Sequence, residues 1–87
     1  MKVPLQDVVV MGTKGLQDLT GLALSTVAGA EPLETGWRLQ VELVEKESIP
    51  RSMDVLGLYD VWMDADGHLL RFARRSTRRR SDVSEES

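Results

Sequence analysis

The sequence predicts an α+β domain in which one N-terminal amphipathic helix packs on an antiparallel meander of three to four strands. Residues 5–22 repeat their apolar side chains with the period of an α-helix, and residues 37–43 alternate apolar and polar side chains as a half-buried strand does. At 87 residues the chain is long enough for one domain and too short for two. We therefore expect a single domain over residues 1–78 and a disordered tail over residues 79–87, where the apolar content is too low to support folding.

The first predicted element is a helix over residues 5–20. Its apolar face is formed by Leu5, Val8, Val9, Leu16 and Leu19. Pro4 suits the first turn, and Gly21 after the last turn is a typical stop signal. Gly12 falls on the apolar face, where its missing side chain would let the helix lie close to a sheet. A short strand over residues 8–11 is the alternative.

Strands are predicted to follow the helix. Their ranges are about 27–33, 37–45, 54–63 and 68–75. The second range is the clearest, because its apolar side chains at every other position share one face. The first range contains Gly29 and Pro32, which are tolerated best in an edge strand. The third is apolar on both faces except at Asp60, so we expect it to be central or covered twice.

A turn is predicted at residues 64–67, between the last two strands. Asp side chains bond to the backbone of such turns, and Gly supplies the positive φ that closes them. Asp64, Asp66 and Gly67 also resemble the start of a calcium loop, but its twelfth position would be Ala73 instead of Glu. The turn is therefore preferred, and His68, the single histidine, is expected to be exposed beside it.

No motif in the sequence predicts catalysis. The run VVVMGTKG at residues 8–15 places Lys14 ahead of its second glycine, which is not the spacing of a phosphate loop. The absence of cysteine removes disulfides and cysteine-based zinc sites. Glu42, Glu45 and Glu47 are interpreted as solvated acids of a strand surface. We therefore expect a non-enzymatic protein with no catalytic residue, no metal site and no cofactor.

Charge is distributed unevenly along the chain. Residues 31–66 contain nine acids and three bases, whereas residues 71–80 contain six arginines and no acid. Clustered arginines can neutralise phosphates, so a small nucleic-acid-binding or regulatory protein acting through residues 71–80 is the alternative function. Phe72 is the single aromatic residue of this run, so no stacking platform is predicted and nucleic acid is not expected as the partner. The run can also be a counterpart for the acidic middle of the chain.

The hydropathy pattern bears on localisation. No apolar stretch approaches the roughly 20 residues that a membrane-spanning helix needs. Gln6 and Asp7 interrupt the start before an apolar stretch of secretory length develops. We therefore expect a cytoplasmic protein without a membrane partner.

An ordered series of motifs fills residues 36–78. Trp37 opens a strand that runs through VELVE at 41–45, and IP at 49–50, DVLG at 54–57 and YDV at 59–61 follow, before an arginine-rich end. In this order, the motifs resemble the signature of the gas vesicle protein O family, and LTG at 19–21 is similar to the family's helix end. The chain departs from the family at residues 76–78, where an aromatic residue next to arginine is common.

The resemblance implies a gas vesicle accessory protein, a non-enzymatic factor that takes part in building the protein-walled, gas-filled compartments of some prokaryotes. It implies binding to the gas vesicle shell protein and to other gas vesicle accessory proteins. It implies a location in the cytoplasm and at the gas vesicle, and it carries over no catalytic residue.

A partner-binding surface is predicted on the sheet face opposite the helix. Alternation directs Tyr59, Val61, Leu70 and Phe72 toward the helix. An apolar patch rimmed by arginines would remain on the other face, and such patches mark interaction sites. The candidate partner-binding residues are Leu56, Leu58, Trp62, Leu69, Arg71, Arg74 and Arg75. The alternatives are that Trp62 caps the core or that residues 22–33 cover this face.

Overall fold

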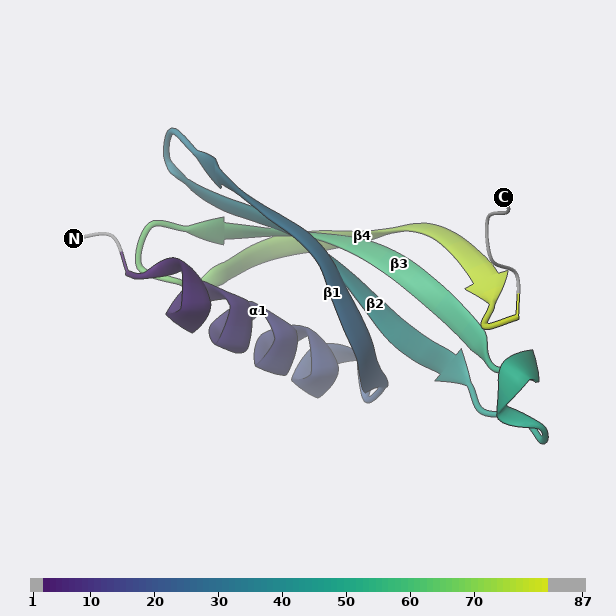
Figure 1. Ribbon diagram of the computed structural model, residues 1–87. Coiled ribbons are helices and arrows are strands. Elements are labelled where there is room, and N and C mark those ends of the chain that lie inside the picture. Colours follow the sequence, from purple (N-terminus) through teal and green to yellow (C-terminus); the bar gives the residue numbers. More distant parts are fainter. Residues whose placement is uncertain (1–2, 82–87) are drawn as a thin grey trace.

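The computed structural model describes residues 3–81, and its elements follow the predicted order of one helix and a meander. The elements are α1 (Leu5–Thr20), β1 (Ala23–Leu33), β2 (Gly36–Lys46), the short 3₁₀ helix η1 (Arg51–Met53), β3 (Val55–Asp64) and β4 (Leu69–Arg79). The strands form one antiparallel sheet in the order β1-β2-β3-β4, and α1 crosses one of its faces (Figure 1). The predicted α+β class is confirmed, with four strands.

Helix α1 lies close to the sheet because of a glycine. A Cβ atom added to Gly12 would collide with the side chain of Leu39 and lie 2.7 Å from the sulfur of Met63. Two larger residues of the same helix face, Val8 and Leu16, are fully buried. The helix ends at Gly21, whose φ of 72° lets its N–H bond to the carbonyl of Gln17. The close approach predicted for the glycine is confirmed, and the alternative strand over residues 8–11 is wrong.

The core lies between α1 and the two central strands. The buried sheet residues of this core are Trp37, Leu39, Val41 and Leu43 of β2 and Tyr59, Val61 and Met63 of β3. Alternation in both strands directs these side chains to one face, which is the face that α1 covers. Strand β3 lies between β2 and β4, so its predicted central position is confirmed.

Two strands extend beyond their predicted ranges. β1 begins at Ala23, four residues before the expected start, because it pairs with β2 as far as Val44. β4 continues to Arg79, because it pairs with β3 as far as Val55. The predicted tail at 79–87 therefore needs correction at its start, where residues 79–81 belong with the fold. Residues 82–87 lie outside the described residues.

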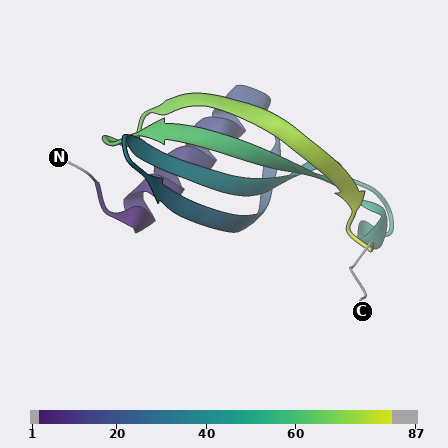
Figure 2. The same cartoon turned by 90° about the horizontal axis from the view of Figure 1, so that it is seen from above.

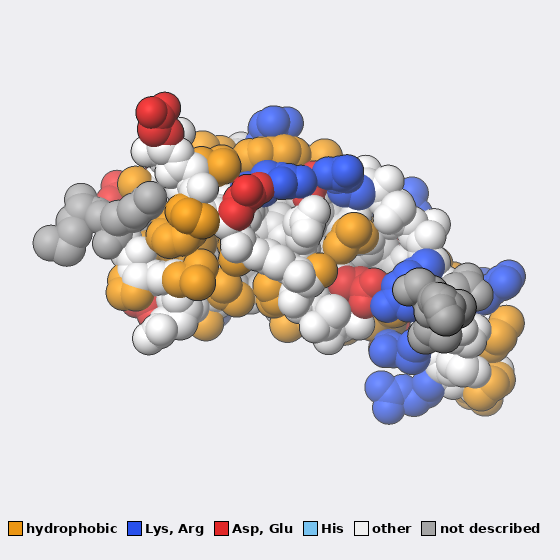
Figure 3. Space-filling model, turned by 45° about the horizontal axis from the view of Figure 1, so that its top comes forward, with side chains coloured by type: hydrophobic (Ala, Val, Ile, Leu, Met, Phe, Trp, Pro, Cys, Tyr) orange, Lys and Arg blue, Asp and Glu red, His pale blue; other side chains and the backbone are white. Residues whose placement is uncertain are grey.

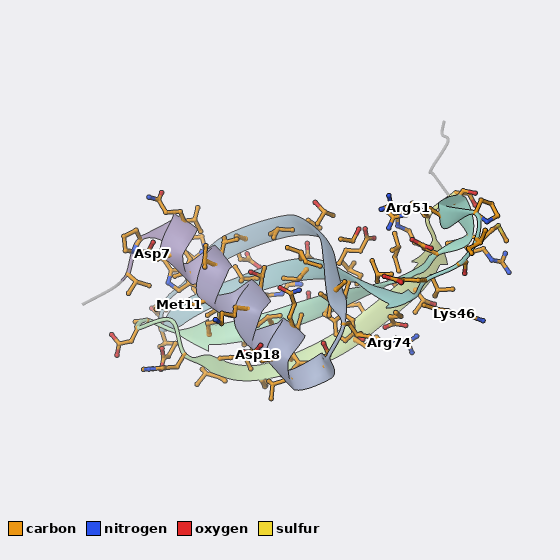
Figure 4. All side chains as sticks on the ribbon, turned by 90° about the horizontal axis from the view of Figure 1, so that it is seen from below. Asp7, Met11, Asp18, Lys46, Arg51 and Arg74 are labelled. Carbon is orange, nitrogen blue, oxygen red and sulfur yellow. The ribbon has the colours of Figure 1, made fainter. Side chains whose placement is uncertain are left out.

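The molecule is elongated, with extents of 45 × 29 × 19 Å. Seen from above, the sheet face opposite α1 is open across all four strands (Figure 2). Seen from below, α1 covers one end of the sheet, and the end that carries η1 extends beyond it (Figure 4). The fold therefore presents a helix-free sheet face and a free end next to η1.

Candidate interaction surface

The helix-free face carries a row of paired charges that crosses all four strands. Arg38 of β2 binds Glu31 of β1 and also contacts Asp60 of β3, with 3.3 Å between Nη2 and Oδ1. Asp60 accepts a second hydrogen bond from Nη1 of Arg75 in β4, at 2.7 Å. Acidic and basic side chains lie next to one another on this face in Figure 3. The row links the four strands through their side chains.

Asp60 is the centre of this row, and it is 2% exposed although it lies on the outer face. Burial alone would raise the pKa of Asp60, but the guanidiniums of Arg75 and Arg38 outweigh that effect and hold the pKa below its usual range. The carboxyl group is therefore ionised at neutral pH and anchors two arginines.

A second buried carboxylate on this face is Glu42. It accepts hydrogen bonds from Nε and Nη2 of Arg78, at 2.9 and 3.1 Å, and from the hydroxyl of Ser25 at 3.2 Å. Glu42 points outward, as alternation requires, but it is only 7% exposed. Its interpretation as a solvated acid is wrong, because side chains from two other strands cover it.

Arg74 lies on the opposite face, at the edge of the core. Its Nε and Nη2 bind the carboxylate of Glu45 at 2.9 and 2.7 Å, and the hydroxyl of Tyr59 donates to the same group at 2.6 Å. Burial and the neighbouring Glu45 raise the pKa of Tyr59 to about 12, so this hydroxyl keeps its proton. The absence of a side chain at Gly57 leaves room for the Glu45 carboxylate. A Cβ atom added at Gly57 would lie 2.6 Å from Cδ of Glu45, which is too close for an ordinary contact.

The partner-binding residues predicted in β3 differ in their exposure to solvent. Leu56 is 1% exposed, so it is covered within the helix-free face instead of forming a patch. Leu58 and Trp62 are half-buried on the same face. The guanidinium carbon of Arg71 lies 3.7 Å from the centroid of the Trp62 ring, in a cation–π stack. Trp62 lies outside the core cluster, and β1 is a strand of the sheet, so neither alternative for this face applies.

The candidates of β4 lie on both faces of the sheet, and irregular pairing decides which of two leucines faces the core. Register shifts leave Leu70 and Arg75 without a partner residue on β3. As a result, Leu69 packs against the core and Leu70 is 63% exposed, which reverses the orientation predicted for this pair. Arg74 and Arg75 point to opposite faces, as alternation requires of neighbouring strand residues. The structure therefore brings together Leu58, Trp62, Arg71 and Arg75 on the helix-free face and removes Leu69 and Arg74 from it.

The turn between β3 and β4 forms as predicted. Oδ1 of Asp64 accepts the N–H groups of Asp66 and His68, both at 2.9 Å, and Gly67 has a φ of 91°. The His68 side chain is 76% exposed. Carboxylate and imidazole atoms of Asp64, Asp66 and His68 lie within 4.8 Å of one another. The hydrogen bonds of the turn account for this grouping without a metal ion.

Sequence reasoning missed which acids hold the arginines. Within the described residues, at least four of the six arginines in residues 71–80 bind carboxylates that lie far away in the sequence. The pairs are Arg74 with Glu45, Arg75 with Asp60, Arg78 with Glu42 and Arg80 with Asp54. The signal was the contrast between the acidic middle of the chain and its arginine run, which indicated a counterpart without indicating the partners.

Helix α1, with 16 residues, is shorter than a bilayer requires, and within residues 3–81 no helix is long and apolar enough to cross a membrane.

The family model described as gas vesicle synthesis protein GvpO matches residues 2–84, which include every element of the described fold. The chain belongs to this family. The resemblance seen in residues 36–78 is therefore confirmed, and it extends over α1 and β1. Membership connects the chain with gas vesicles.

Individual relatives are similar to the chain over most of its length. It is 42% identical over 71 residues to gas vesicle protein O of a Streptomyces species, covering 79% of this chain and 56% of the relative. It is 33% identical over 70 residues to gas vesicle protein O1 of Halobacterium salinarum, covering 80% of this chain and 59% of the relative. The match to gas vesicle protein O of Haloferax mediterranei is 39% identical over 51 residues, covering 59% of this chain and 36% of the relative. The chain thus spans little more than half the length of the first two relatives. No solved structure matches it.

Proposed function

We propose that this chain is a non-enzymatic accessory protein of gas vesicle assembly, which acts by binding other proteins in the cytoplasm and at the gas vesicle. The observation that carries the proposal is the family match over residues 2–84. The proposed partners are the gas vesicle shell protein and other gas vesicle accessory proteins. The fold supports binding over catalysis, because the buried carboxylates Glu42, Asp54 and Asp60 are each held by an arginine.

The proposed contact on the helix-free face consists of Leu58, Trp62, Arg71 and Arg75. Trp and Arg are the residue types most enriched at interface hot spots. The stack of Arg71 on Trp62 also holds both side chains in one arrangement before binding. Less side-chain entropy is then lost when a partner is bound.

Nucleic-acid binding through residues 71–80 is the second candidate function, and the ion pairs weigh against it. At least four of the six arginines are paired with a carboxylate of the described residues, and Arg71 stacks on Trp62. A guanidinium that is already paired with a carboxylate neutralises a phosphate less effectively, so fewer counterions are released from the nucleic acid. The affinity that counterion release contributes is therefore reduced. Protein binding is therefore the function that the charges favour.

The test measures binding of the purified chain to the purified shell protein and to each purified accessory protein of the same gas vesicle cluster, at physiological salt. We expect Trp62→Ala to weaken binding of one partner by more than about 1 kcal/mol, the usual hot-spot threshold, while thermal unfolding remains cooperative. Val10→Ala is the matched control, because Val10 is 64% exposed on α1, away from this face.

Two results would contradict the proposal at different levels. If Trp62→Ala unfolds the domain or binds every partner as the wild type does, Trp62 is not the anchor. If the wild-type chain binds DNA or RNA specifically at physiological salt and binds none of the gas vesicle proteins, the assembly function is wrong.

A further inference from the structure

The loop between β2 and β3 exposes apolar side chains at the end of the molecule beyond α1. Ile49 is fully exposed, at 101%, and Met53 is 41% exposed, with the exposed Pro50 between them. We call these three residues the apolar tip. Single exposed apolar residues are ordinary on protein surfaces, so exposure alone indicates nothing. What distinguishes the apolar tip is the structure that holds it in place.

The buried carboxylate of Asp54 binds the start of this loop, at Ser48, and the end of the chain segment after β4, at Arg80. Asp54 is 4% exposed, and its Oδ1 accepts the N–H of Ser48 at 2.7 Å. Its Oδ2 accepts a hydrogen bond from Nη2 of Arg80 at 3.2 Å. The N–H of Ser48 and the side chain of Arg80 together hold the pKa of Asp54 below its usual range, against the effect of burial. The Asp54 carboxylate is therefore ionised at neutral pH.

The backbone adds further bonds to the same loop. The N–H of Arg80 donates to the carbonyl of Asp54 at 2.8 Å, and the N–H of Ser81 donates to that of Ser52 at 2.9 Å. Within η1, the N–H of Met53 donates to the carbonyl of Pro50 at 3.0 Å. The apolar side chains are therefore displayed on a backbone that is already fixed, which lowers the entropy lost when they are buried by a partner.

The charges around the apolar tip differ from those of the whole chain. Residues 46–54 and 79–80 contain four basic and two acidic residues, whereas the chain has a net charge of −3. Asp54 and Arg80 form an ion pair, so their charges offset each other and the basic excess remains. Lys46 and Arg51 lie at this end of the sheet and are exposed (Figure 4). A surface that buries Ile49 and carries acidic groups around it complements this arrangement.

We propose that the apolar tip is a docking surface for a gas vesicle protein, which receives Ile49 and Met53 in an apolar pocket with an acidic rim. The inference rests on the proposed function and adds a second contact, separate from Trp62 on the helix-free face. A protein partner fits better than an anionic membrane, because the negative net charge of the chain opposes adsorption to anionic lipid.

The first experiment compares Ile49→Asp with Val10→Asp in binding to the purified shell protein and to each purified accessory protein. Both replaced side chains are exposed apolar residues, and valine and aspartate have similar helix propensities, so both variants are expected to fold. Ile49→Asp should weaken binding of one partner about tenfold or more, since burial of one isoleucine accounts for that factor. Val10→Asp should leave the same dissociation constant within about twofold of the wild-type value, because Val10 is not in the interface.

Three further variants test the contact directly. The chain has no cysteine, so Ile49→Cys provides a single thiol for a benzophenone photo-crosslinker. We expect it to crosslink to the same partner, whereas Val10→Cys should not. Arg51→Glu should weaken this interaction most at low salt, where attraction to an acidic rim is strongest. Binding that Arg51→Glu leaves unchanged would contradict the acidic rim.

The outcomes separate the inference from the function on which it rests. If the wild-type chain binds a gas vesicle protein and Ile49→Asp binds it equally well, the apolar tip is not a docking surface and the proposed function stands. If the wild-type chain binds none of these proteins, the proposed function fails first. The chain is also tested on vesicles of phosphatidylglycerol and phosphatidylcholine in roughly equal parts. Vesicle binding that Ile49→Asp abolishes, with protein binding unchanged, would assign the tip to membranes and overturn the inference.

Discussion

At the scale of single residues, Gly12 and Gly15 lie in the same helix but meet different surroundings. A Cβ at Gly12 would collide with Leu39 and Met63, whereas a Cβ at Gly15 would lie at an ordinary contact distance, 3.5 Å, from Cδ1 of Leu69. Alanine favours a helix over glycine by about 1 kcal/mol, and overpacking a core costs about 1–3 kcal/mol. We expect Gly15→Ala to raise the free energy of unfolding by about 1 kcal/mol and Gly12→Ala to lower it by up to about 2 kcal/mol, measured by urea unfolding. Changes of the same sign would contradict the close approach of α1 to the sheet.

Glu42 and Asp60 show how far residue patterns can predict a site. Alternation correctly predicts that Glu42 points away from the core, and the acid in the otherwise apolar β3 is visible in the sequence as Asp60. Alternation does not predict that both are buried. Burial here comes from Arg78 and Arg75, which belong to a strand far along the chain, and one sequence does not specify which arginine reaches which acid.

At the scale of elements, the end of β4 and the loop at η1 stabilise each other. Residues 79–81 supply two backbone hydrogen bonds and one ion pair to residues 52–54. Deletion of residues 79–87 should therefore lower the free energy of unfolding by about 2 kcal/mol relative to deletion of residues 82–87, since each backbone hydrogen bond contributes about 1 kcal/mol. Hydrogen exchange should show faster exchange at the amides of residues 48–54 in the longer deletion only. Equal stability and exchange in the two deletions would show that residues 79–81 do not support the loop.

Irregular pairing in β4 explains the wrong orientations predicted for this element. A strict period of two directs Leu70 toward the helix and keeps Leu69 on the other face. The register shift at this point inserts Leu70, so Leu69, which precedes it, lies on the same face as Phe72. The second shift falls at Arg75, after Arg74 has paired with Tyr59, so Arg74 and Arg75 lie on opposite faces as strict alternation already requires of neighbours. No turn or glycine signal in β4 marks either irregularity.

At the scale of the whole molecule, the ion pairs make the free energy of unfolding depend on pH in the acidic range. Burial would raise the pKa of Asp60 and of Glu45, but the arginines bound to each lower it below the ordinary value. The unfolded chain therefore binds protons at a higher pH than the folded chain does, and the stabilisation is present above about pH 4 and lost as the pH falls through the folded pKa values. We expect the free energy of unfolding to decrease from about pH 5 to about pH 2, measured by urea unfolding at each pH.

Asp60→Asn provides the control for this dependence. It removes one of the groups with a lowered pKa, so the decrease in unfolding free energy between the two pH values should be smaller than in the wild type. Glu34→Gln, at an exposed turn position, should leave the decrease unchanged. An equal decrease in wild type and Asp60→Asn would mean that the central ion pair does not contribute to acid sensitivity.

Local patterns in the sequence are sufficient for the order of elements, the helix bounds, the turn at residues 64–67 and the family. Helical and strand periods, a turn with Asp and Gly, and a run of motifs are all properties of neighbouring residues, so no knowledge of distant contacts is needed to recognise them. The tertiary structure alone decided that Leu69 packs in the core, that Arg75 binds Asp60, and that residues 79–81 hold the η1 loop. These features depend on strand register and on charges that meet across the sheet, and both are set by residues that lie far apart in the chain.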